Sequence, residues 1–477
     1  MSRQERSHRP PWAATWSPAR IIVVAFAVVI LLGGILLSLP ISGRDGKPVG
    51  FLDALFTANS AVCVTGLVVV DTATAYSNFG QLVVMLLIQV GGLGIASAAS
   101  IALLIGRRIT LRERILLQES LGQETLQGIV RLTRYILLTT LVVEATGAML
   151  LAWRFVPLWG WKRGLATAVF HAVSAFNNAG FDLMGGFRSL TGFATDPFVL
   201  LVIAGLLITG GIGFPVILDL HRWLSRRIGP LRRPAATTVL SAGSNGERHE
   251  GRLLLHTQVV LVVTAALLVV GTALILLLEW RNPATLGVLS LPDRLVNAFF
   301  QAATARTAGF NSLPIGSLTQ GALVILVILM YIGASPASTG GGIKTSTFAA
   351  IALGLRATIR GSADVTVSER RLVRGVLDRA VAIAMLALGL VVTVSILLTV
   401  TERNRFSFLA VLFETTSAFG TVGLSTGITP ELSPAGRLLI MLTMFTGRVG
   451  PLTFATALAA RERAVSVHYP EDSVIIG

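Results

Sequence analysis

The sequence predicts an all-α integral membrane protein. Four repeats of a membrane span, a short re-entrant helix, a loop and a second span are expected to surround a pore with pseudo-fourfold symmetry. Of the 477 residues, 53% are hydrophobic and only 13% are charged, and the mean hydropathy of +0.75 is not reached by ordinary soluble domains. A glycine-centred motif recurs four times, each time after a short apolar segment.

The repeated motif is defined by its glycines and by two residues at fixed distances before them. The glycines are Gly66, Gly180, Gly309 and Gly423, separated by 114, 129 and 114 residues. Ten residues earlier stand Phe56, Phe170, Phe299 and Phe413, and six residues earlier stand Ser60, Ser174, Ala303 and Ser417. A single copy would favour glycines at helix contacts or turns, which are common in membrane proteins. Four copies indicate an internal repeat with one shared role.

The first repeat shows how each element is assigned. Ile21–Leu39 holds 19 residues without a charge, enough to cross a hydrocarbon core of about 30 Å as a retained first span. Phe51–Val62 is apolar but too short to cross, so it predicts a re-entrant helix. Gly80–Gly106 is expected to return across the membrane.

The other repeats follow the same order. Outward spans are predicted at about Leu132–Trp153, Leu253–Leu278 and Val376–Val400, short helices at Gly164–Phe176, Asp293–Ala305 and Phe406–Ala418, and return spans at Pro197–Leu220, from Leu318, and at Pro434–Leu458. The total is eight full spans and four re-entrant segments. Loops of this kind cannot satisfy their own backbone in lipid, so the repeats are expected to bury them around one axis.

The domain organisation follows from these elements. It comprises an N-terminal tail (1–20), pore repeat 1 (21–106), pore repeat 2 (131–220), a linker (221–251), pore repeat 3 (252–360), pore repeat 4 (376–460) and a C-terminal tail (461–477). The linker is rich in Arg, Pro, Gly and Ser and has no apolar period, which accounts for the longer spacing between the second and third glycines.

The formal net charge of +15 is distributed as in a membrane protein, and the distribution argues against nucleic-acid binding. Arginines gather in the N-terminal tail and in 107–134, 222–252 and 356–379, always between apolar spans. This alternation is the positive-inside signature and predicts that both termini lie in the cytoplasm. The single cysteine, Cys63, excludes an internal disulfide and has no basic neighbour that would favour a thiolate.

The residues before each glycine suit a cation pathway lined by main-chain carbonyls. A potassium ion that loses its hydration water needs other oxygen ligands with an electrostatic field similar to that of water. The main-chain carbonyls of four extended loops can supply them. Glycine permits a close approach that a Cβ would obstruct, and the short helices are expected to direct their negative ends toward the path. The candidate filter residues are Val64, Thr65 and Gly66; Asn178, Ala179 and Gly180; Thr307, Ala308 and Gly309; and Thr421, Val422 and Gly423.

The motifs TANSAVCVTGL, FNNAGF, ARTAGFN and SAFGTVGLST resemble those of the Trk/Ktr/HKT superfamily of potassium transport proteins, and the likeness covers nearly the whole chain. The short N-terminal region is most similar to that of the B-type membrane subunit of Ktr systems. In this family a glycine in all four loops accompanies potassium permeation and a serine in the first loop accompanies sodium selectivity, so Gly66 indicates potassium. The resemblance implies potassium uptake across the cell membrane, with K+ held by the filter carbonyls and no cofactor in this chain.

The same resemblance implies partners. A cytosolic nucleotide-binding regulatory subunit of RCK type is expected to dock on the arginine-rich loops. The family subunit is a homodimer in a lipid membrane, and the tail HYPEDSVIIG resembles its dimer-contact segment.

A glycine-rich break marks a candidate gate in the third repeat. Residues 331–347, YIGASPASTGGGIKTST, contain Pro336 and Gly340, Gly341 and Gly342, which cannot stay helical in lipid and should therefore line a cavity. By resemblance this is the intramembrane gating loop, and Lys344 falls within it. The alternative is a plain helix break from which Lys344 snorkels to the cytoplasm.

Arg448 is the second gate candidate because a charge within a membrane span is costly and therefore functional by default. By resemblance it opposes cation passage below the filter. The alternative is a structural arginine bonded to loop carbonyls, and the two roles can coexist.

The remaining charged and polar residues of the spans receive structural assignments. Glu414 is expected either to attract cations at the outer mouth or to interact with a helix dipole. Glu144 and Glu279 are expected to pair with polar neighbours, and His171 and Arg306 are expected to be hydrogen-bonding framework residues.

The sequence therefore predicts the translocating subunit of a potassium uptake system, and it leaves open whether transport is coupled to sodium or protons. One alternative is the potassium-binding subunit of a P-type ATPase pump. Another is an integral-membrane enzyme such as a lipid or glycosyl transferase. No pair of acidic or His residues has convincing catalytic spacing, and no nucleotide-binding loop or metal-binding cluster is present in the sequence, so we expect no enzyme.

Overall fold

The computed structural model describes residues 18–94, 129–228, 253–362, 364–367, 370–371 and 375–458. The described chain is helical apart from a two-stranded antiparallel ribbon of β1 (Thr366–Val367) and β2 (Arg370–Arg371). This agrees with the predicted helical membrane fold. Most of the N-terminal tail, the end of the first return span, most of the linker and the C-terminal tail with its expected dimer-contact segment lie outside the described residues.

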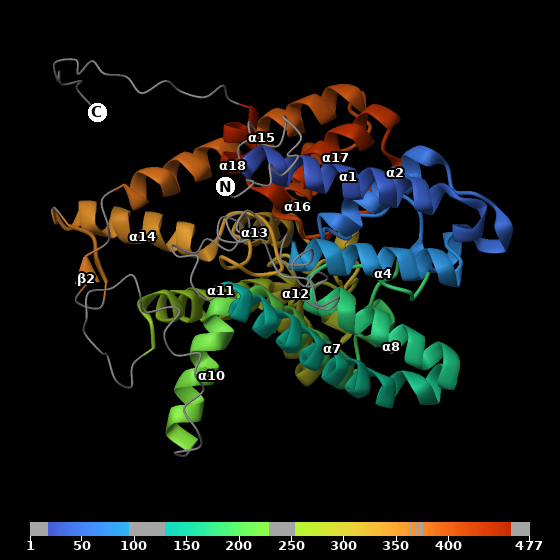
Figure 1. Ribbon diagram of the computed structural model, residues 1–477, viewed down its shortest axis with the longest axis horizontal. Coiled ribbons are helices and arrows are strands. Elements are labelled where there is room, and N and C mark those ends of the chain that lie inside the picture. The colour runs from blue at the N-terminus through green and yellow to red at the C-terminus, as the bar shows by residue number, and fades with distance from the viewer. Residues whose placement is uncertain are drawn as a thin grey trace, which may run out of the picture.

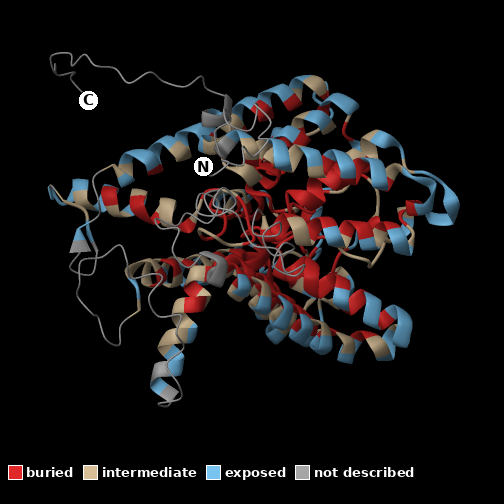
Figure 2. Cartoon of the chain, in the orientation of Figure 1, coloured by how far each residue is buried: buried red, intermediate tan, exposed pale blue. Residues whose placement is uncertain are grey.

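Each repeat begins with a long helix. These are α1 (Pro18–Ser38), α7 (Ile129–Trp159), α11 (Leu255–Glu279) and α15 (Val376–Thr401). Their outward faces carry exposed apolar side chains such as Leu32, Val269 and Val400, while buried residues concentrate at the centre of the molecule (Figures 1 and 2). An apolar exterior of this kind is suited to lipid.

Within the described residues, four helical stretches are long and apolar enough to cross a membrane. They are Arg20–Ser38, Thr133–Phe176, Leu255–Glu279 and Val376–Thr401. A fifth span is added if the bent pair Pro197–Gly211 and Phe214–Ser225 is counted as one. The expected total of eight spans stays a prediction.

A short, central helix follows each long helix. These are α2 (Phe51–Val62), α8 (Trp161–Phe176), α12 (Leu291–Thr304) and α16 (Phe408–Gly420). The repeated phenylalanines Phe56, Phe170 and Phe413 are buried, whereas in α12 the neighbouring Phe300 is the fully buried ring. The side chains of Ser290 and Ser407 cap α12 and α16 by accepting backbone N–H bonds at 3.4 Å and 3.3 Å.

The helices that return from the loops start with the same device. These are α4 (Asn78–Leu93), α9 (Pro197–Gly211), α13 (Gln320–Tyr331) and α17 (Pro434–Val449). Each is capped by an oxygen-bearing side chain that accepts a backbone N–H, from Ser77, Asp196, Thr319 and Ser433. The proline that opens α9 and α17 has the φ value that a first helical turn requires.

The return spans expected at Pro197–Leu220 and Pro434–Leu458 are not continuous helices, so that part of the prediction is wrong. After α9 the chain bends by 101° into α10 (Phe214–Ile228), and Gly213 has a φ of 92° there. After α17, Gly450 has a φ of 95° and is followed by α18 (Pro451–Leu458). A helix ends where a residue with positive φ is followed by a proline, which has no N–H to donate. The apolar composition of both segments had favoured an unbroken helix.

The third return segment is broken where the sequence places the candidate gate. Residues 332–344 separate α13 from α14 (Thr345–Ile359). The first return helix, α4, ends at Gly94, which has a φ of 57°. The remaining described elements are α3 (Thr72–Ala75) and short 3-10 turns at Pro40–Ser42, Arg44–Gly46, Thr191–Phe193, Leu286–Val288, Ile315–Ser317 and Thr429–Glu431.

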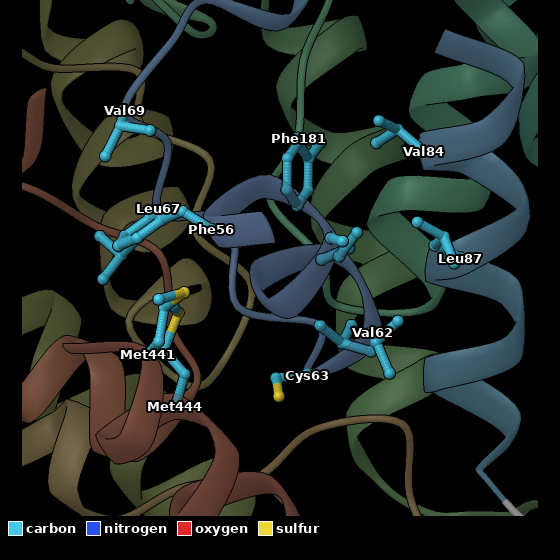
Figure 3. Close-up of a cluster of buried hydrophobic side chains, with 14 of the residues drawn as sticks. Phe56, Val62, Cys63, Leu67, Val69, Val84, Leu87, Phe181, Met441 and Met444 are labelled. Carbon is cyan, nitrogen blue, oxygen red and sulfur yellow. The ribbon is translucent and has the colours of Figure 1, made fainter. Parts of the chain in front are cut away.

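Repeats 1 and 4 meet along a seam of apolar and polar contacts. Around the first loop, Leu67 packs in one buried cluster with Met441 and Met444 of α17 (Figure 3). The Asn59 amide of α2 donates to the Met441 carbonyl at 3.1 Å, and Arg437 of α17 forms a half-buried ion pair with Asp53 of α2. The last repeat therefore contacts the first, as a closed arrangement requires.

Candidate functional site

The four glycine loops share one backbone pattern. The residue two before each glycine has a positive φ (Val64 57°, Asn178 58°, Thr307 72° and Thr421 49°), and so do the glycines (Gly66 89°, Gly180 70°, Gly309 82° and Gly423 92°). The residues between them, Thr65, Ala179, Ala308 and Val422, are outside the positive region. Alternation of this kind turns successive carbonyls toward one side. Positive φ at Val and Thr is uncommon and concentrates at functional sites.

The glycines contact one another in cyclic order. A Cβ placed on Gly66 would clash with the Ala179 carbonyl oxygen of loop 2. The same holds for Gly180 and Ala308, for Gly309 and Val422, and for Gly423 and Thr65. Each glycine thus lies against the carbonyl of the next loop, and the fourth loop returns to the first. Only glycine permits this approach, and the candidate filter residues of all four repeats are brought together by it.

Serines at the ends of the short helices hold three of the loops. The Gly66 and Gly423 N–H groups donate to the Ser60 and Ser417 hydroxyls at 3.0 Å and 3.1 Å. In the second loop the Ser174 hydroxyl donates to the Phe181 carbonyl at 2.7 Å. These bonds fix the loop backbone to a buried helix.

A polar network supports the second loop from behind. The Asn177 amide donates to the Gln89 carbonyl oxygen at 2.9 Å and to the Glu144 carboxylate at 2.8 Å. The Gln89 amide donates to the same carboxylate at 3.3 Å. Glu144 thus pairs with polar neighbours, as expected, and joins repeats 1 and 2. Glu279 likewise accepts bonds from Asn282, Thr285 and Thr319.

One face of the ring carries a small acidic mouth beside its first and second loops. A cavity of about 20 Å³ is lined by Gly66, Val68, Asp71, Thr72, Gly180, Phe181, Asp182 and Phe187. Burial in this mouth, together with the neighbouring Asp71, raises the pKa of the Asp182 carboxyl to about 6, against hydrogen bonds from the Met184 and Gly185 amides that lower it. Sequence reasoning missed both aspartates, although each follows a motif glycine by a few residues.

The opposite face of the ring is covered by residues 332–344. The Gly341 N–H donates to the Thr421 hydroxyl at 3.1 Å, and the Thr339 hydroxyl lies 2.9 Å from the Asn178 amide. A Cβ on Gly340 would clash with the Thr307 hydroxyl. The segment also bonds to repeat 2, because the Ser335 and Thr339 N–H groups donate to the Gly211 and Gly210 carbonyls at 3.0 Å and 3.3 Å. Thr339 was not among the expected site residues.

The two basic candidates of the gate bind this segment. Lys344 Nζ donates to the Gly340 carbonyl at 2.8 Å and stays half-buried instead of reaching outward. Arg448 of α17 donates to the Thr339 carbonyl and also to the Gly91 and Gly92 carbonyls of α4. In the cyclic order, repeats 1 and 3 are opposite each other, so the Arg448 guanidinium bridges the space between them.

The expectation for Glu414 is wrong. Glu414 is fully buried and accepts bonds from Ser425, Thr426 and Thr429, so it holds the exit of the fourth loop and is not at an outer mouth. Arg306 is buried, and its Nε has no hydrogen-bond partner among the described residues, so its expected hydrogen-bonding role stays a prediction. The His171 ring, in contrast, lies 2.8 Å from the Thr167 carbonyl.

Comparison with known proteins shows the family of this chain. Residues 6–469 match the TrkH family, described as a cation transport protein. The chain is 41% identical over 463 residues to the Ktr system potassium uptake protein B of Bacillus subtilis (strain 168), with 97% of each chain covered. It is 37% identical over 471 residues to the potassium/sodium uptake protein NtpJ of Enterococcus hirae, again with 97% of each covered.

A solved structure has the same fold. The crystal structure of the potassium transporter TrkH from Vibrio parahaemolyticus superposes with a TM-score of 0.69 at 16% sequence identity, covering 96% of this chain and 87% of that one.

The acidic mouth predicts a pH-dependent step. Asp182 is ionised above a pH of about 6 and neutral below it, and Asp71 lines the same mouth. One charge about 6 Å from a hydrated cation changes its energy by about 0.7 kcal/mol, so rubidium uptake into vesicles should fall about threefold between pH 7.5 and pH 5. Asp182→Asn should have the low rate at both pH values.

The matched control for this prediction is Asp45→Asn, at an exposed position outside the mouth, which should keep the wild-type step. If Asp182→Asn kept the same step, the group that titrates would be another one.

Proposed function

The chain belongs to the TrkH family of cation transport proteins, and we propose that it translocates potassium into the cell through the four glycine loops. The resemblance to the Trk/Ktr/HKT superfamily is thereby confirmed, and the chain is a transport protein and not an enzyme. The observation that carries the potassium proposal is the cyclic contact of the four loops, in which each glycine meets the carbonyl of the next. Conduction runs down the electrochemical gradient.

In the proposed filter, main-chain carbonyls replace the water of the ion. The carbonyls belong to the twelve candidate residues 64–66, 178–180, 307–309 and 421–423, whose alternating φ values turn them to one side. The four short helices are buried around the ring and supply the partial negative charge of their C-terminal ends. The side chains of these residues serve mainly to keep the lining narrow.

Residues 331–347 are the proposed gate. The segment covers one face of the ring and is bonded to the second and fourth loops through Thr339 and Gly341. Arg448 ties it to repeat 1 and places a positive charge in the space a cation would cross. Lys344 holds the triple glycine in its folded turn. Opening therefore requires these bonds to break together.

The proposal also covers the partners of this chain, its location in the cell and the ion to which transport is coupled. The Bacillus relative is named as protein B of a Ktr system, which supports a multi-component assembly. The proposed components are an RCK-type cytosolic subunit and a homodimer of this chain, as the family resemblance implies. The proposed location is the cell membrane with both termini in the cytoplasm. The Enterococcus relative is named for sodium as well as potassium, so the flux assay below includes sodium. The relatives' names do not support the alternative of a pump subunit.

Gly66→Ser tests the potassium filter. A Cβ at this position would meet the carbonyl of Ala179 and would sit at a positive φ, so the ring must widen or distort at the first loop. In proteoliposomes of purified protein, passive rubidium influx should fall and the potassium-to-sodium flux ratio should drop about tenfold. A tenfold drop corresponds to a loss of about 1.4 kcal/mol in the free energy that discriminates potassium from sodium.

The control for this variant is Gly192→Ser, because nothing lies within 4 Å of a Cβ there and the backbone is not at positive φ. It should keep the wild-type flux and ratio. Full potassium selectivity in Gly66→Ser would contradict the role of the first loop, and absence of passive flux in the wild-type protein would contradict the proposed function itself.

Arg448→Ala tests the gate. Removal of the guanidinium deletes three bonds to backbone carbonyls and one positive charge. Charged hydrogen bonds contribute about 1.5 to 3 kcal/mol each, so loss of the set should favour the open segment and raise passive rubidium flux at least about tenfold. Arg405→Ala, at an exposed ion pair, is the control. Unchanged flux with an unchanged melting temperature would remove Arg448 from the gate.

A further inference from the structure

The third loop lacks the serine that holds the other three. Six residues before the glycine stand Ser60, Ser174 and Ser417 in repeats 1, 2 and 4, and each hydroxyl bonds to its own loop. Repeat 3 has Ala303 at this position, which has no side-chain donor or acceptor. The third loop of the ring therefore lacks the side-chain hydrogen bond that the other three loops have.

The backbone of the third loop is also held differently. In the other loops, the residue before the glycine donates its N–H to the carbonyl of the serine at 2.8 Å, from Thr65, Ala179 and Val422. In the third loop, Ala308 donates instead to the carbonyl of Thr304 at 2.9 Å. Gly309 adds a weak bond to the same carbonyl at 3.5 Å. The bond between the loop and its helix thus spans four residues instead of five. The Ala308 and Gly309 N–H groups share one carbonyl acceptor.

Buried polar atoms without partners gather around the same loop. Among the described residues they include both amide atoms of Gln301, the Thr304 and Thr307 hydroxyls, Arg306 Nε and the Ser312 hydroxyl. Buried polar groups in folded proteins normally have partners, and each one without a partner costs about 1 to 3 kcal/mol. The third loop therefore lacks the full set of bonds that would fix a single backbone geometry.

We infer that the third loop is the compliant quarter of the filter, meaning that its carbonyls move more easily than those of the other three loops. Ala303, which replaces the serine of the other repeats, is the cause of this compliance. The inference rests on the proposed function, since it concerns how that filter discriminates ions. Sodium is smaller than potassium, so it is coordinated well only if carbonyls move inward, and discrimination therefore depends on how firmly the loops are held. The Thr307 hydroxyl of this loop faces Gly340, which places the compliant quarter against the proposed gate.

The test adds a serine to the third loop and removes one from the fourth. Ala303→Ser supplies the missing hydroxyl, and Ser417→Ala reproduces the third-loop arrangement in the fourth loop. One net hydrogen bond of about 1 kcal/mol corresponds to about fivefold. The potassium-to-sodium flux ratio in proteoliposomes should rise about fivefold in Ala303→Ser and fall about fivefold in Ser417→Ala. Ala284→Ser, at an exposed loop position, is the control and should leave the ratio unchanged.

The outcomes separate this inference from the proposed function. Melting temperature in detergent identifies variants that fold, and if Ala303→Ser does not fold, the ratio of Ser417→Ala decides alone. If the wild-type protein carries rubidium but folded variants keep the wild-type ratio, the compliant third loop is overturned and the filter stands. If the wild-type protein carries no rubidium, the proposed function and this inference fail together.

Discussion

The architecture depends on one constraint, which is that backbone N–H and C=O groups cannot be left unsatisfied in lipid. Four non-helical loops at membrane depth are stable only if protein surrounds them. Here each loop is buried at the end of a short helix, and each central glycine lies against the carbonyl of the next loop. In the proposed filter, the carbonyls of the four loops face a shared space. A pathway for a cation would be a consequence of this arrangement, because such a space offers oxygen ligands.

The same constraint explains the segment proposed as a gate. Residues 332–344 are not helical, and their backbone groups bond to Gly210, Gly211 and the Thr421 hydroxyl of neighbouring repeats. Arg448 adds donors to carbonyls of both opposite repeats. The segment is therefore stable when it covers the ring and loses a defined set of bonds when it leaves. The structure shows one bonding state of this segment, and in the proposed gate a regulatory partner would act by releasing it.

The sequence was informative wherever a pattern was local. The offsets of a phenylalanine and of a small residue from each glycine located the short helices and the loops, and the triple glycine located the break after α13. Contacts between distant residues could not be read from it. Thr339 meets Asn178 across 161 positions, and Asp71 joins the second loop through the Phe187 N–H, so neither had a local signal. Gly213 and Gly450 lie in apolar stretches that favour continuous helices, and only the fold shows that the chain bends there. Arg306 was expected to be a hydrogen-bonding framework residue because it precedes the third loop, and only the structure shows that its Nε has no partner among the described residues.

The central claim is that four loops of one chain form a single ring of carbonyl ligands. The most direct measurement is anomalous diffraction from crystals grown in thallium, which substitutes for potassium and scatters strongly. We predict thallium density on the axis enclosed by Gly66, Gly180, Gly309 and Gly423, which disappears when excess potassium is added. Thallium bound elsewhere in the protein, with an empty axis between the four glycines, would contradict the account.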